Sequence, residues 1–391
     1  MKKSIACYLS SHGYGHAVRS LEVVRALARL RPDLDIHIIC AAPPFLFEDV
    51  VGSAPHNVFL RGAATDFGLV QQDPRTFSLA ATAKKLKSFL ACADRVAARE
   101  RQFLERVHTA ALWCDIPFLP FEAAARLGLP AVGMGNFSWD WIYGYYQDFD
   151  PVFAEAADRA KAAYGNALLY LELPHSPPPA AFPRREKIPL VTRVPRFARE
   201  EARARLGLAG DACAVLLGFS ELALDAGARA RIDGFSARDA NARDFRFIVP
   251  APMRLQLANA VYPAMRAIPK PDSSGPAASS GLGFSSLAAA ADVLVTKLGY
   301  GIVSDAVVNG VPLVYTDRGD FPELPYLEAL VRETVGGVFL GREDFEAGRW
   351  AESIEAALAL RHSAPSARSK EPLPLHGAEF AARRFLAETG V

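Results

Sequence analysis

Residues 291–323, ADVLVTKLGYGIVSDAVVNGVPLVYTDRGDFPE, constrain the fold more than any other stretch of this chain. Apolar runs bounded by turn residues predict short buried strands, and glycines predict a tight turn and a helix stop. In order, the segment predicts a strand, a glycine turn, a helix and a second strand: Val293–Thr296, Gly299–Gly301, Ile302–Asn309 and Val311–Thr316. This order predicts a βαβ unit of a parallel sheet.

The same segment is also suited to binding an anion. A strand that passes through a glycine turn into a helix leaves bare N–H groups at the helix N-terminus, and such groups bind phosphate. Lys297 enters the turn and would add a point charge against a diphosphate. Asp305 lies one turn into the helix, where a carboxylate would accept hydrogen bonds from ribose hydroxyls. The alternative is an ordinary crossover whose glycines only allow close packing, and these residues leave both interpretations open.

A second strand–turn–helix unit begins the chain. Ile5–Leu9 predicts an apolar strand, apolar side chains then recur at helical spacing, and Ile36–Cys40 predicts the next strand. His12 and His16 flank the glycine turn after the first strand, where open α/β sheets bind ligands. Because the start of a helix disfavours a charged imidazolium, His16 is predicted to be a neutral, basic ring. The alternative is a solvated or capping role.

Three more segments place polar or small side chains after predicted strands. Asp115 follows the predicted strand Ala111–Cys114 and points to the sheet crevice, although the residue by itself is more typical of a helix cap. Residues 136–143, NFSWDWIY, would either line an acceptor pocket or form a packed hairpin or lid. Gly218–Ser220 is a second small-residue turn, suited to a phosphate or a nucleoside.

Composition limits the classes of function. At 391 residues the chain is long enough for two or three domains. Its 44 lysines and arginines balance 43 acidic residues, which argues against a nucleic-acid partner. The brief apolar run near the N-terminus stops at Ser10, too early for a signal peptide or a transmembrane segment. The five cysteines form no C-x-x-C pair, so we expect no zinc site and predict a cytoplasmic protein.

The chain is expected to divide at a proline-dense stretch. Residues 171–200 hold seven prolines, which predicts a stiff connection between domains, and a new α/β pattern begins at Ala214. We therefore expect one domain over residues 1–190 and another over residues 191–391, with the terminal helices packing back on the first.

Three motifs resemble those of a known family. Ser11–Arg19 (SHGYGHAVR), Asn136–Tyr143 (NFSWDWIY) and Lys297–Asp305 (KLGYGIVSD) are similar to the N-terminal, GT-B-like domain of plant and bacterial L-arabinokinases. The similarity runs from about residue 4 to 340 and leaves out the kinase domain of those enzymes. More distantly, the chain resembles MurG-type and plant UDP-glycosyltransferases. The resemblance implies the GT-B fold, in which two Rossmann-like domains face a cleft. Ile302 departs from it, because a small hydroxyl residue usually follows Gly-Tyr-Gly.

The resemblance also implies roles by position. His16 matches a histidine that acts as general base or acceptor-site residue, and Asp115 matches the aspartate that orients this base. Lys297 stands in place of a phosphate-binding histidine, and Asp305 in place of a ribose-binding glutamate. The other residues implied to bind the donor are Gly218, Ser220, Gly299, Tyr300, Gly301, Ser304, Arg318, Asp320 and Glu323. Those proposed for the acceptor are His12, Gly13, Asn136, Trp139 and Asp140.

These roles imply a glycosyltransferase that moves a sugar from a nucleotide-sugar donor, a UDP-sugar, to a hydroxyl acceptor. His16 would take the acceptor proton, while Lys297 and the helix after Gly301 would stabilise the leaving diphosphate. No metal, cofactor or nucleic-acid partner is expected; donor and acceptor are the expected partners. The alternatives are a nucleotide-sugar epimerase or hydrolase, and a non-catalytic nucleotide-sugar binding protein.

Overall fold

In the computed structural model the chain forms two compact units, each built on its own sheet. Unit 1 comprises residues 1–72, 77–192 and 373–391, and unit 2 comprises residues 73–76 and 193–372. The residues that the structure describes are 2–47, 50–51, 57–73, 75–178, 181–235, 244–263, 282–362 and 373–391.

The sheet of unit 1 has seven strands in the order β3-β2-β1-β6-β7-β8-β9, and all its neighbours are parallel. The strands are β1 (Ser4–Leu9), β2 (Asp35–Ile39), β3 (Val58–Arg61), β6 (Thr109–Asp115), β7 (Ala131–Gly135), β8 (Leu169–Glu172) and β9 (Arg185–Lys187). Every residue of β1 is buried, as expected for a strand covered on both faces. The strands predicted at β1, β2 and β6 are confirmed to within about two residues at each end.

Among the described residues of unit 1, six α-helices pack around this sheet. They are α1 (Gly15–Leu30), α3 (Leu79–Arg106), α4 (Leu119–Arg126), α5 (Trp139–Tyr145), α6 (Pro151–Tyr164) and α14 (Gly377–Thr389). Unit 1 also holds the short 3-10 helix η1 (Pro44–Leu46) and the antiparallel strands β4 (Val70–Gln71) and β5 (Phe77–Ser78).

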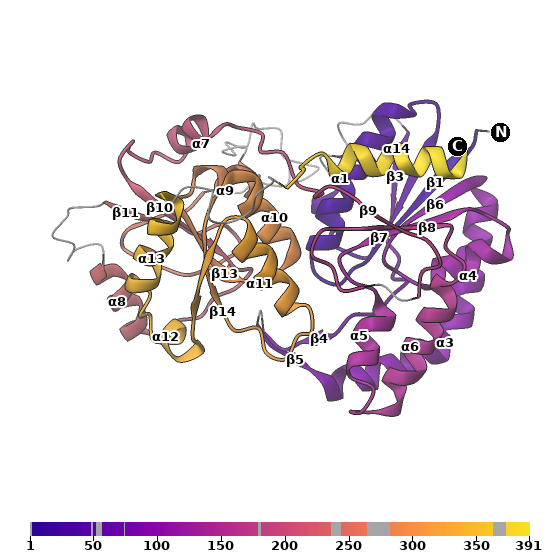
Figure 1. The fold of residues 1–391 in the computed structure, drawn as a ribbon, viewed down its shortest axis with the longest axis horizontal. Coiled ribbons are helices and arrows are strands. Elements are labelled where there is room, and N and C mark those ends of the chain that lie inside the picture. Colours follow the sequence, from indigo (N-terminus) through magenta and orange to yellow (C-terminus); the bar gives the residue numbers. More distant parts are fainter. Residues whose placement is uncertain are drawn as a thin grey trace, which may run out of the picture. The chain divides into compact units, whose positions relative to one another are not determined.

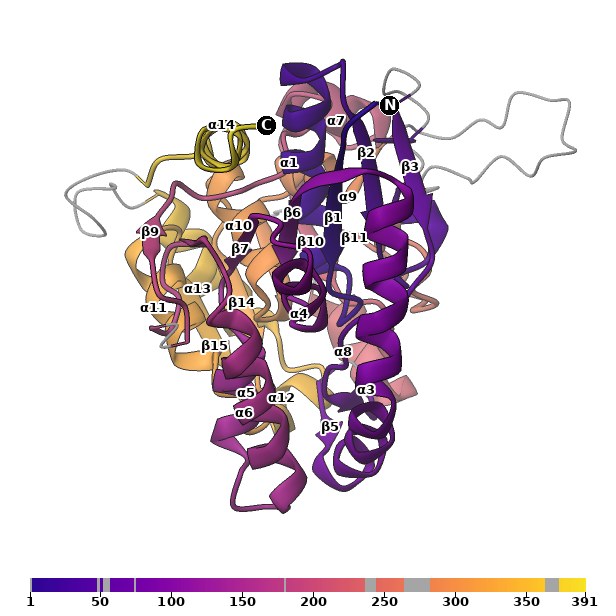
Figure 2. The ribbon, with the colours of Figure 1, turned by 90° about the vertical axis from the view of Figure 1, so that its right-hand side faces the viewer.

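The helix α14 is far from α1 in sequence but lies beside it in unit 1 (Figures 1 and 2). Phe385 of α14 meets Trp113 of β6 edge to face, with ring centroids 5.8 Å apart. Gly377 begins this helix, and a Cβ added there would overlap the carbonyl oxygen of Pro189. The start of α14 therefore needs a glycine to approach the backbone that follows β9.

The sheet of unit 2 has six strands in the order β12-β11-β10-β13-β14-β15, again all parallel. The strands are β10 (Cys213–Gly218), β11 (Phe245–Ile248), β12 (Ala260–Val261), β13 (Val293–Lys297), β14 (Leu313–Thr316) and β15 (Gly337–Leu340). The helices are α7 (Arg199–Arg205), α8 (Ala226–Phe235), α9 (Phe284–Ala290), α10 (Tyr300–Asn309), α11 (Leu324–Glu333), α12 (Arg342–Glu346) and α13 (Ala351–His362). The predicted helix stop is confirmed, because Gly310 follows α10 with a left-handed φ of 61°.

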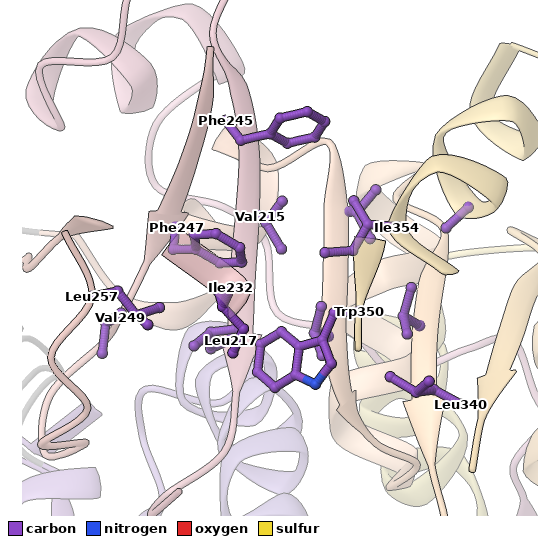
Figure 3. Close-up of a cluster of buried hydrophobic side chains, with 14 of the residues drawn as sticks. Val215, Leu217, Ile232, Phe245, Phe247, Val249, Leu257, Leu340, Trp350 and Ile354 are labelled. Atoms are coloured by element: carbon purple, nitrogen blue, oxygen red, sulfur yellow. The ribbon is translucent and has the colours of Figure 1, made fainter. Parts of the chain in front are cut away.

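A hydrophobic cluster of unit 2 lies on one face of its sheet (Figure 3). Leu217 of β10 and Phe247 of β11 point into it, where they meet Trp350 and Ile354. The alternate residues of the central strands, such as Leu216, are buried as well. Because both faces of this sheet are covered, its central strands are continuous apolar runs in the sequence. Such runs predict buried strands.

Part of the proline-dense stretch belongs to the sheet of unit 1. β9 pairs in parallel with β8, and beyond it the N–H of Leu190 donates to the carbonyl of Pro374 at 2.8 Å. The prediction of a connection over all of residues 171–200 is therefore wrong for its first part. β9 lies at an edge of the sheet, where prolines nearby are tolerated because no ladder continues beyond it.

Within the described ranges, no helix is both long enough and apolar enough to cross a membrane.

Candidate functional site

Both sheets reverse their strand order next to predicted site residues. In unit 1 the chain runs from β1 outward to β3 and then returns to the other side of β1 with β6; unit 2 does the same at β10 and β13. Open α/β sheets bind ligands at such reversals, at the carboxyl ends of the two central strands. His16 follows β1 and Asp115 ends β6, while Gly218 and Lys297 end β10 and β13. Each unit thus brings two predicted residues to its own reversal point.

In unit 1 the first turns of α1 place three side chains on the Asp115 carboxylate. His16 Nδ1 lies 2.8 Å from Oδ1, Arg19 Nε donates to Oδ2 at 2.7 Å, and Ser20 Oγ donates to Oδ2 at 2.5 Å. Arg19 Nη2 also donates to Oδ1 at 2.5 Å, so the guanidinium binds the carboxylate with two nitrogens. The three side chains share one face because helix positions three and four apart are neighbours.

The Asp115 carboxylate is held ionised although it is fully buried. Burial raises the pKa of this carboxyl, but the charge of Arg19 and the hydrogen bonds from Arg19 and His16 outweigh burial and keep the pKa well below its ordinary value. Its contacts leave no lone-pair position unused, since a carboxylate offers about four. The helix-cap alternative for Asp115 fails, because α4 begins at Leu119 without a side-chain cap.

The His16 ring is buried against the aromatic residue Phe137. The two rings meet edge to face with centroids 5.2 Å apart, and His16 is 6% exposed. When Nδ1 carries the proton, Asp115 accepts it and Nε2 keeps its lone pair. That tautomer is the one a general base requires.

A second buried carboxylate, Asp66, supports the loop that carries His12. Trp139 Nε1 donates to Asp66 Oδ2 at 2.9 Å, and the Ser10 hydroxyl also hydrogen-bonds this carboxylate. Burial raises the pKa of Asp66 above its ordinary value, against the opposing effect of these hydrogen bonds and of His16. The His12 ring packs edge to face on Trp139, with centroids 5.4 Å apart.

The residues expected to bind an acceptor fall into an outer and an inner layer. His12 and Asp140 are partly exposed and Gly13 is exposed. Asn136 and Trp139 are buried, and Asn136 accepts a hydrogen bond from the Arg19 guanidinium. The inner pair thus supports the site from behind, and a direct acceptor contact stays a prediction. The hairpin alternative for residues 136–143 is wrong, because α5 begins at Trp139.

In unit 2 the glycine turn leads directly into α10. Gly299 occupies the cap position with an extended backbone and offers no side chain to the N–H groups of the first turn, which includes Gly301. Tyr300 is buried, and Ser304 Oγ donates to its carbonyl at 2.8 Å. The Ser304 hydroxyl is therefore used within the helix, and its predicted donor contact stays a prediction.

Lys297 ends β13 beside Thr316 of β14. Burial, helped by the nearby charge of Arg318, lowers the pKa of Lys297 to about 8, while Asp73 acts in the opposite direction. The ammonium is thus held in a cationic neighbourhood, and an anion bound beside it would favour its charged form.

Ile302 fills the space in front of Gly218. A Cβ added at Gly218 would overlap Ile302 Cδ1 and would lie 2.9 Å from Thr296 Oγ1. Thr296 Oγ1 in turn donates to the Gly218 carbonyl at 2.8 Å. The glycine therefore lets α10 pack against the end of β10, and its contact with a nucleotide stays a prediction. Ser220, two residues further on, is exposed.

Asp305 is buried and paired with an arginine. Its side chain is 1% exposed, and Arg193 binds both of its oxygens: Nε lies 3.1 Å from Oδ1, and Nη2 contacts Oδ2. Burial raises the pKa of Asp305, against the opposing charge of Arg193. Arg193 is 25% exposed and lies over the ring of Phe284, 5.4 Å from its centroid. A ribose contact by Asp305 stays a prediction, and it requires Arg193 to move aside.

The remaining predicted donor residues lie in the segment between β14 and α11. Arg318 Nη1 donates to the Leu298 carbonyl at 2.9 Å, and the guanidinium lies 4.0 Å from the centroid of the Phe321 ring. Glu323 is buried near Arg318, whereas Asp320 is exposed. Of these two acids, both implied to bind the donor, Asp320 is therefore the more accessible to a ligand.

The sequence predictions missed four residues that organise these clusters: Arg19, Ser20, Asp66 and Arg193. Arg19 and Ser20 carried a signal, because they follow His16 by three and four positions in a helix. Asp66 and Arg193 carried none, since each lies far along the chain from its partner. Over the part of the chain that the structure describes, no group of three or more His, Cys, Asp or Glu side chains is arranged to hold a metal ion.

The chain is similar to one curated enzyme over most of its length. L-arabinokinase of Arabidopsis thaliana is 29% identical over 372 residues, which cover 91% of this chain and 32% of that protein. The chain therefore spans about a third of the length of this relative. No protein-family model matches the chain.

Solved structures match the whole chain. CalG4, the calicheamicin glycosyltransferase, has a TM-score of 0.59 at 18% identity and covers 100% of this chain and 99% of its own. The UDP-glucose:anthocyanidin 3-O-glucosyltransferase in complex with UDP has a TM-score of 0.58 at 12% identity, with the same coverage. UGT89C1 of Arabidopsis thaliana with UDP-L-rhamnose has a TM-score of 0.58 at 13% identity and covers 100% of both chains. The chain therefore has the GT-B fold of two Rossmann-like domains and, as its motifs predicted, resembles part of L-arabinokinase.

Proposed function

We propose that this chain is a glycosyltransferase that moves a sugar from a nucleotide-sugar donor, a UDP-sugar, to a hydroxyl acceptor. The observation that carries the proposal is the contact between His16 Nδ1 and the ionised, buried Asp115 at the strand reversal of unit 1. The fold supports it, because GT-B neighbours were solved with UDP and with UDP-L-rhamnose.

In the proposed mechanism His16 is the general base and Asp115 orients it. Asp115 holds the Nδ1 proton, and Nε2 takes the proton of the acceptor hydroxyl while its oxygen attacks the anomeric carbon. The bond from that carbon to the diphosphate breaks, and the diphosphate leaves with the bonding electrons. The imidazolium formed on His16 is stabilised by the carboxylate beside it.

The leaving diphosphate is bound by unit 2 in this proposal. The first turn of α10 offers N–H groups and the positive end of the helix dipole, and Lys297 adds a charge. These groups stabilise the negative charge that develops on the diphosphate, so the proposal includes activity without a divalent metal. Full turnover in excess EDTA supports this part, and activity that returns only with magnesium or manganese contradicts it.

A thermal-shift screen against nucleotide-sugars tests the donor site first. A ligand at about 100 times its dissociation constant adds about 2.7 kcal/mol to the free energy of unfolding, which is easily measured. Lys297→Met is expected to weaken the response to UDP-sugars. Lys187→Met, which removes an exposed lysine of unit 1, is the matched control and is expected to respond like the wild type.

Product analysis then separates transfer from its alternatives. The donor that binds is incubated with and without a panel of hydroxyl acceptors, and products are identified by mass spectrometry. A glycosylated acceptor supports the proposal. Isomerised or hydrolysed donor in the absence of acceptor identifies an epimerase or hydrolase, and binding without turnover across the panel identifies a binding protein.

A further inference from the structure

We propose that Thr316 is a further donor-binding residue, whose hydroxyl donates a hydrogen bond to the phosphoryl group that Lys297 attracts. This contact rests on the proposed function, since it belongs to the donor diphosphate on unit 2. It adds a residue that the motifs did not single out, because the sequence predicted Thr316 only as the end of a strand.

The Thr316 hydroxyl is buried and unpaired. Thr316 ends β14 and is 1% exposed, and among the residues that the structure describes its Oγ1 has no hydrogen-bond partner. A buried hydroxyl without a partner destabilises a folded chain, because it has given up its hydrogen bonds to water. Thr296 of the neighbouring strand shows the usual arrangement, since its Oγ1 donates to the Gly218 carbonyl at 2.8 Å. The hydroxyl of Thr316 is therefore suited to pairing with a ligand.

Thr316 and Lys297 are neighbours across two strands. They are paired in the parallel register of β13 and β14. Each lies two residues after a valine, Val314 or Val295, of the hydrophobic cluster on one face of this sheet (Figure 3). Because side chains alternate along a strand, both side chains leave the sheet on the face of that cluster. The hydroxyl and the ammonium thus lie together at the carboxyl edge of the sheet.

The surroundings of Lys297 favour an anion at this edge. Over the described part of the chain, its ammonium forms no hydrogen bond or ion pair. Its charged neighbours are Arg318, a second cation, and Asp73, which also belongs to unit 2. The Asp73 carboxylate is held within its own turn, where it accepts from two N–H groups and a hydroxyl. Lys297 therefore supplies the attraction for an anion, and Thr316 supplies a donor with a fixed direction.

A diphosphate fits this edge better than an anion with a single phosphoryl group. α10 packs on the other face of the sheet, where its Ile302 fills the space in front of Gly218. The first turn of α10 and the pair of Lys297 and Thr316 thus approach the end of β13 from two faces. A diphosphate offers one phosphoryl group to the helix N-terminus and the other to the lysine and the threonine.

Calorimetric titration of the full chain with UDP and with inorganic pyrophosphate tests the contact. In Thr316→Val the affinity for both should fall about tenfold or more, the loss expected for a hydrogen bond to a charged group. Thr316→Ser keeps the hydroxyl and should bind both ligands more tightly than Thr316→Val.

Thermal denaturation without ligand gives a second readout, which a structural role would move in the opposite direction. Thr316→Val replaces an unpaired buried hydroxyl by a methyl group of similar size. The variant should therefore melt about 2 °C or more above the wild type. A hydroxyl that binds a ligand is expected to show both changes, a loss of affinity and a gain of stability.

Thr82→Val is the matched control. Thr82 is a fully buried threonine of α3 in unit 1, and its Oγ1 donates to the Ser78 carbonyl at 2.6 Å and accepts from the Val70 N–H at 2.9 Å. Because this hydroxyl has partners within the chain, its removal should lower the melting temperature and leave both affinities unchanged. A merely structural hydroxyl of Thr316 would behave in the same way.

The remaining outcomes separate this contact from the proposed function. Wild-type affinity for UDP and pyrophosphate in Thr316→Val overturns the contact, and so does a variant that melts below the wild type. A loss for UDP without a loss for pyrophosphate places the hydroxyl on the nucleoside and also overturns it. A wild type that binds neither ligand overturns both proposals. If both expected changes occur while no sugar is transferred to any acceptor, the role of Thr316 stands and the proposed function fails alone.

Discussion

The pair between Arg193 and Asp305 predicts an asymmetric response to mutation. Asp305 is 1% exposed, whereas Arg193 is 25% exposed. When the arginine is removed, the carboxylate stays buried without a counter-charge; when the acid is removed, the guanidinium turns to water. Breaking a buried ion pair in the first way typically costs about 3–5 kcal/mol of the free energy of unfolding, so we expect that range for Arg193→Met. Asp305→Asn loses charged hydrogen bonds only and should cost about 1–3 kcal/mol.

The pH dependence of Arg193→Met has a definite sign. Burial already raises the pKa of Asp305, and loss of the arginine charge raises it further. A carboxyl whose pKa is higher in the folded than in the unfolded state binds more protons when the protein is folded. The free energy of unfolding of the protein therefore falls as the pH rises. The free energy of unfolding that Arg193→Met loses relative to the wild type should therefore be smaller at pH 5 than at pH 7.5.

Hydrogen exchange followed by mass spectrometry suits this test, because two units need not unfold together. Peptides covering α10 should lose protection in Arg193→Met, and peptides covering β6 in unit 1 serve as the internal control. The double variant Arg193→Met with Asp305→Asn should recover part of the lost protection, since it removes the buried carboxylate that has no counter-charge. Equal losses in the two single variants, or no recovery in the double variant, would refute the reasoning.

Three further predictions follow from the sites. His16→Ala should lower turnover by about 10²–10⁴-fold, the usual contribution of a general base, while UDP affinity measured by calorimetry stays the same; normal turnover in the folded variant contradicts the role of His16. UDP affinity should fall as pH rises through about 8, because Lys297 has its pKa near that value and only its charged form attracts the diphosphate; the same titration of Lys297→Met should lack this change. Gly218→Ala should cost about 1–3 kcal/mol in thermal denaturation by crowding Ile302, and adding Ile302→Ala should restore much of it; equal stability of Gly218→Ala and the wild type argues against the packing role of this glycine.

The fold was predictable where local chemistry and topology agree. Strands buried on both faces, such as β1 and β13, are continuous apolar runs, and Gly310 stops α10 through its left-handed backbone. Placing His16 and Asp115 at the same sheet edge needed only the parallel order of β1 and β6. These features depend on residues close in sequence or on one rule of sheet topology.

What the sequence did not reveal depends on contacts between distant segments. Nothing near Asp305 predicts that Arg193, over a hundred positions earlier, occupies its carboxylate. The space that Gly218 leaves is taken by Ile302, so the role of this glycine depends on a side chain of another element. β9 was missed because its three residues, Arg185–Lys187, are all charged and form no apolar pattern that would predict a strand.

The position of α14 has a consequence for synthesis on the ribosome. Unit 1 contains residues on both sides of unit 2 in the sequence, so Phe385 reaches Trp113 only after residues 193–372 have been made. At about 5–20 residues per second, that takes roughly 10–40 s. Until then the side of β6 that α14 covers stays exposed in the nascent chain, and proteolysis of chains stalled before residue 373 would reveal it. Unit 2 can therefore complete its core before α14 has been made, although the synthesis of unit 1 begins first.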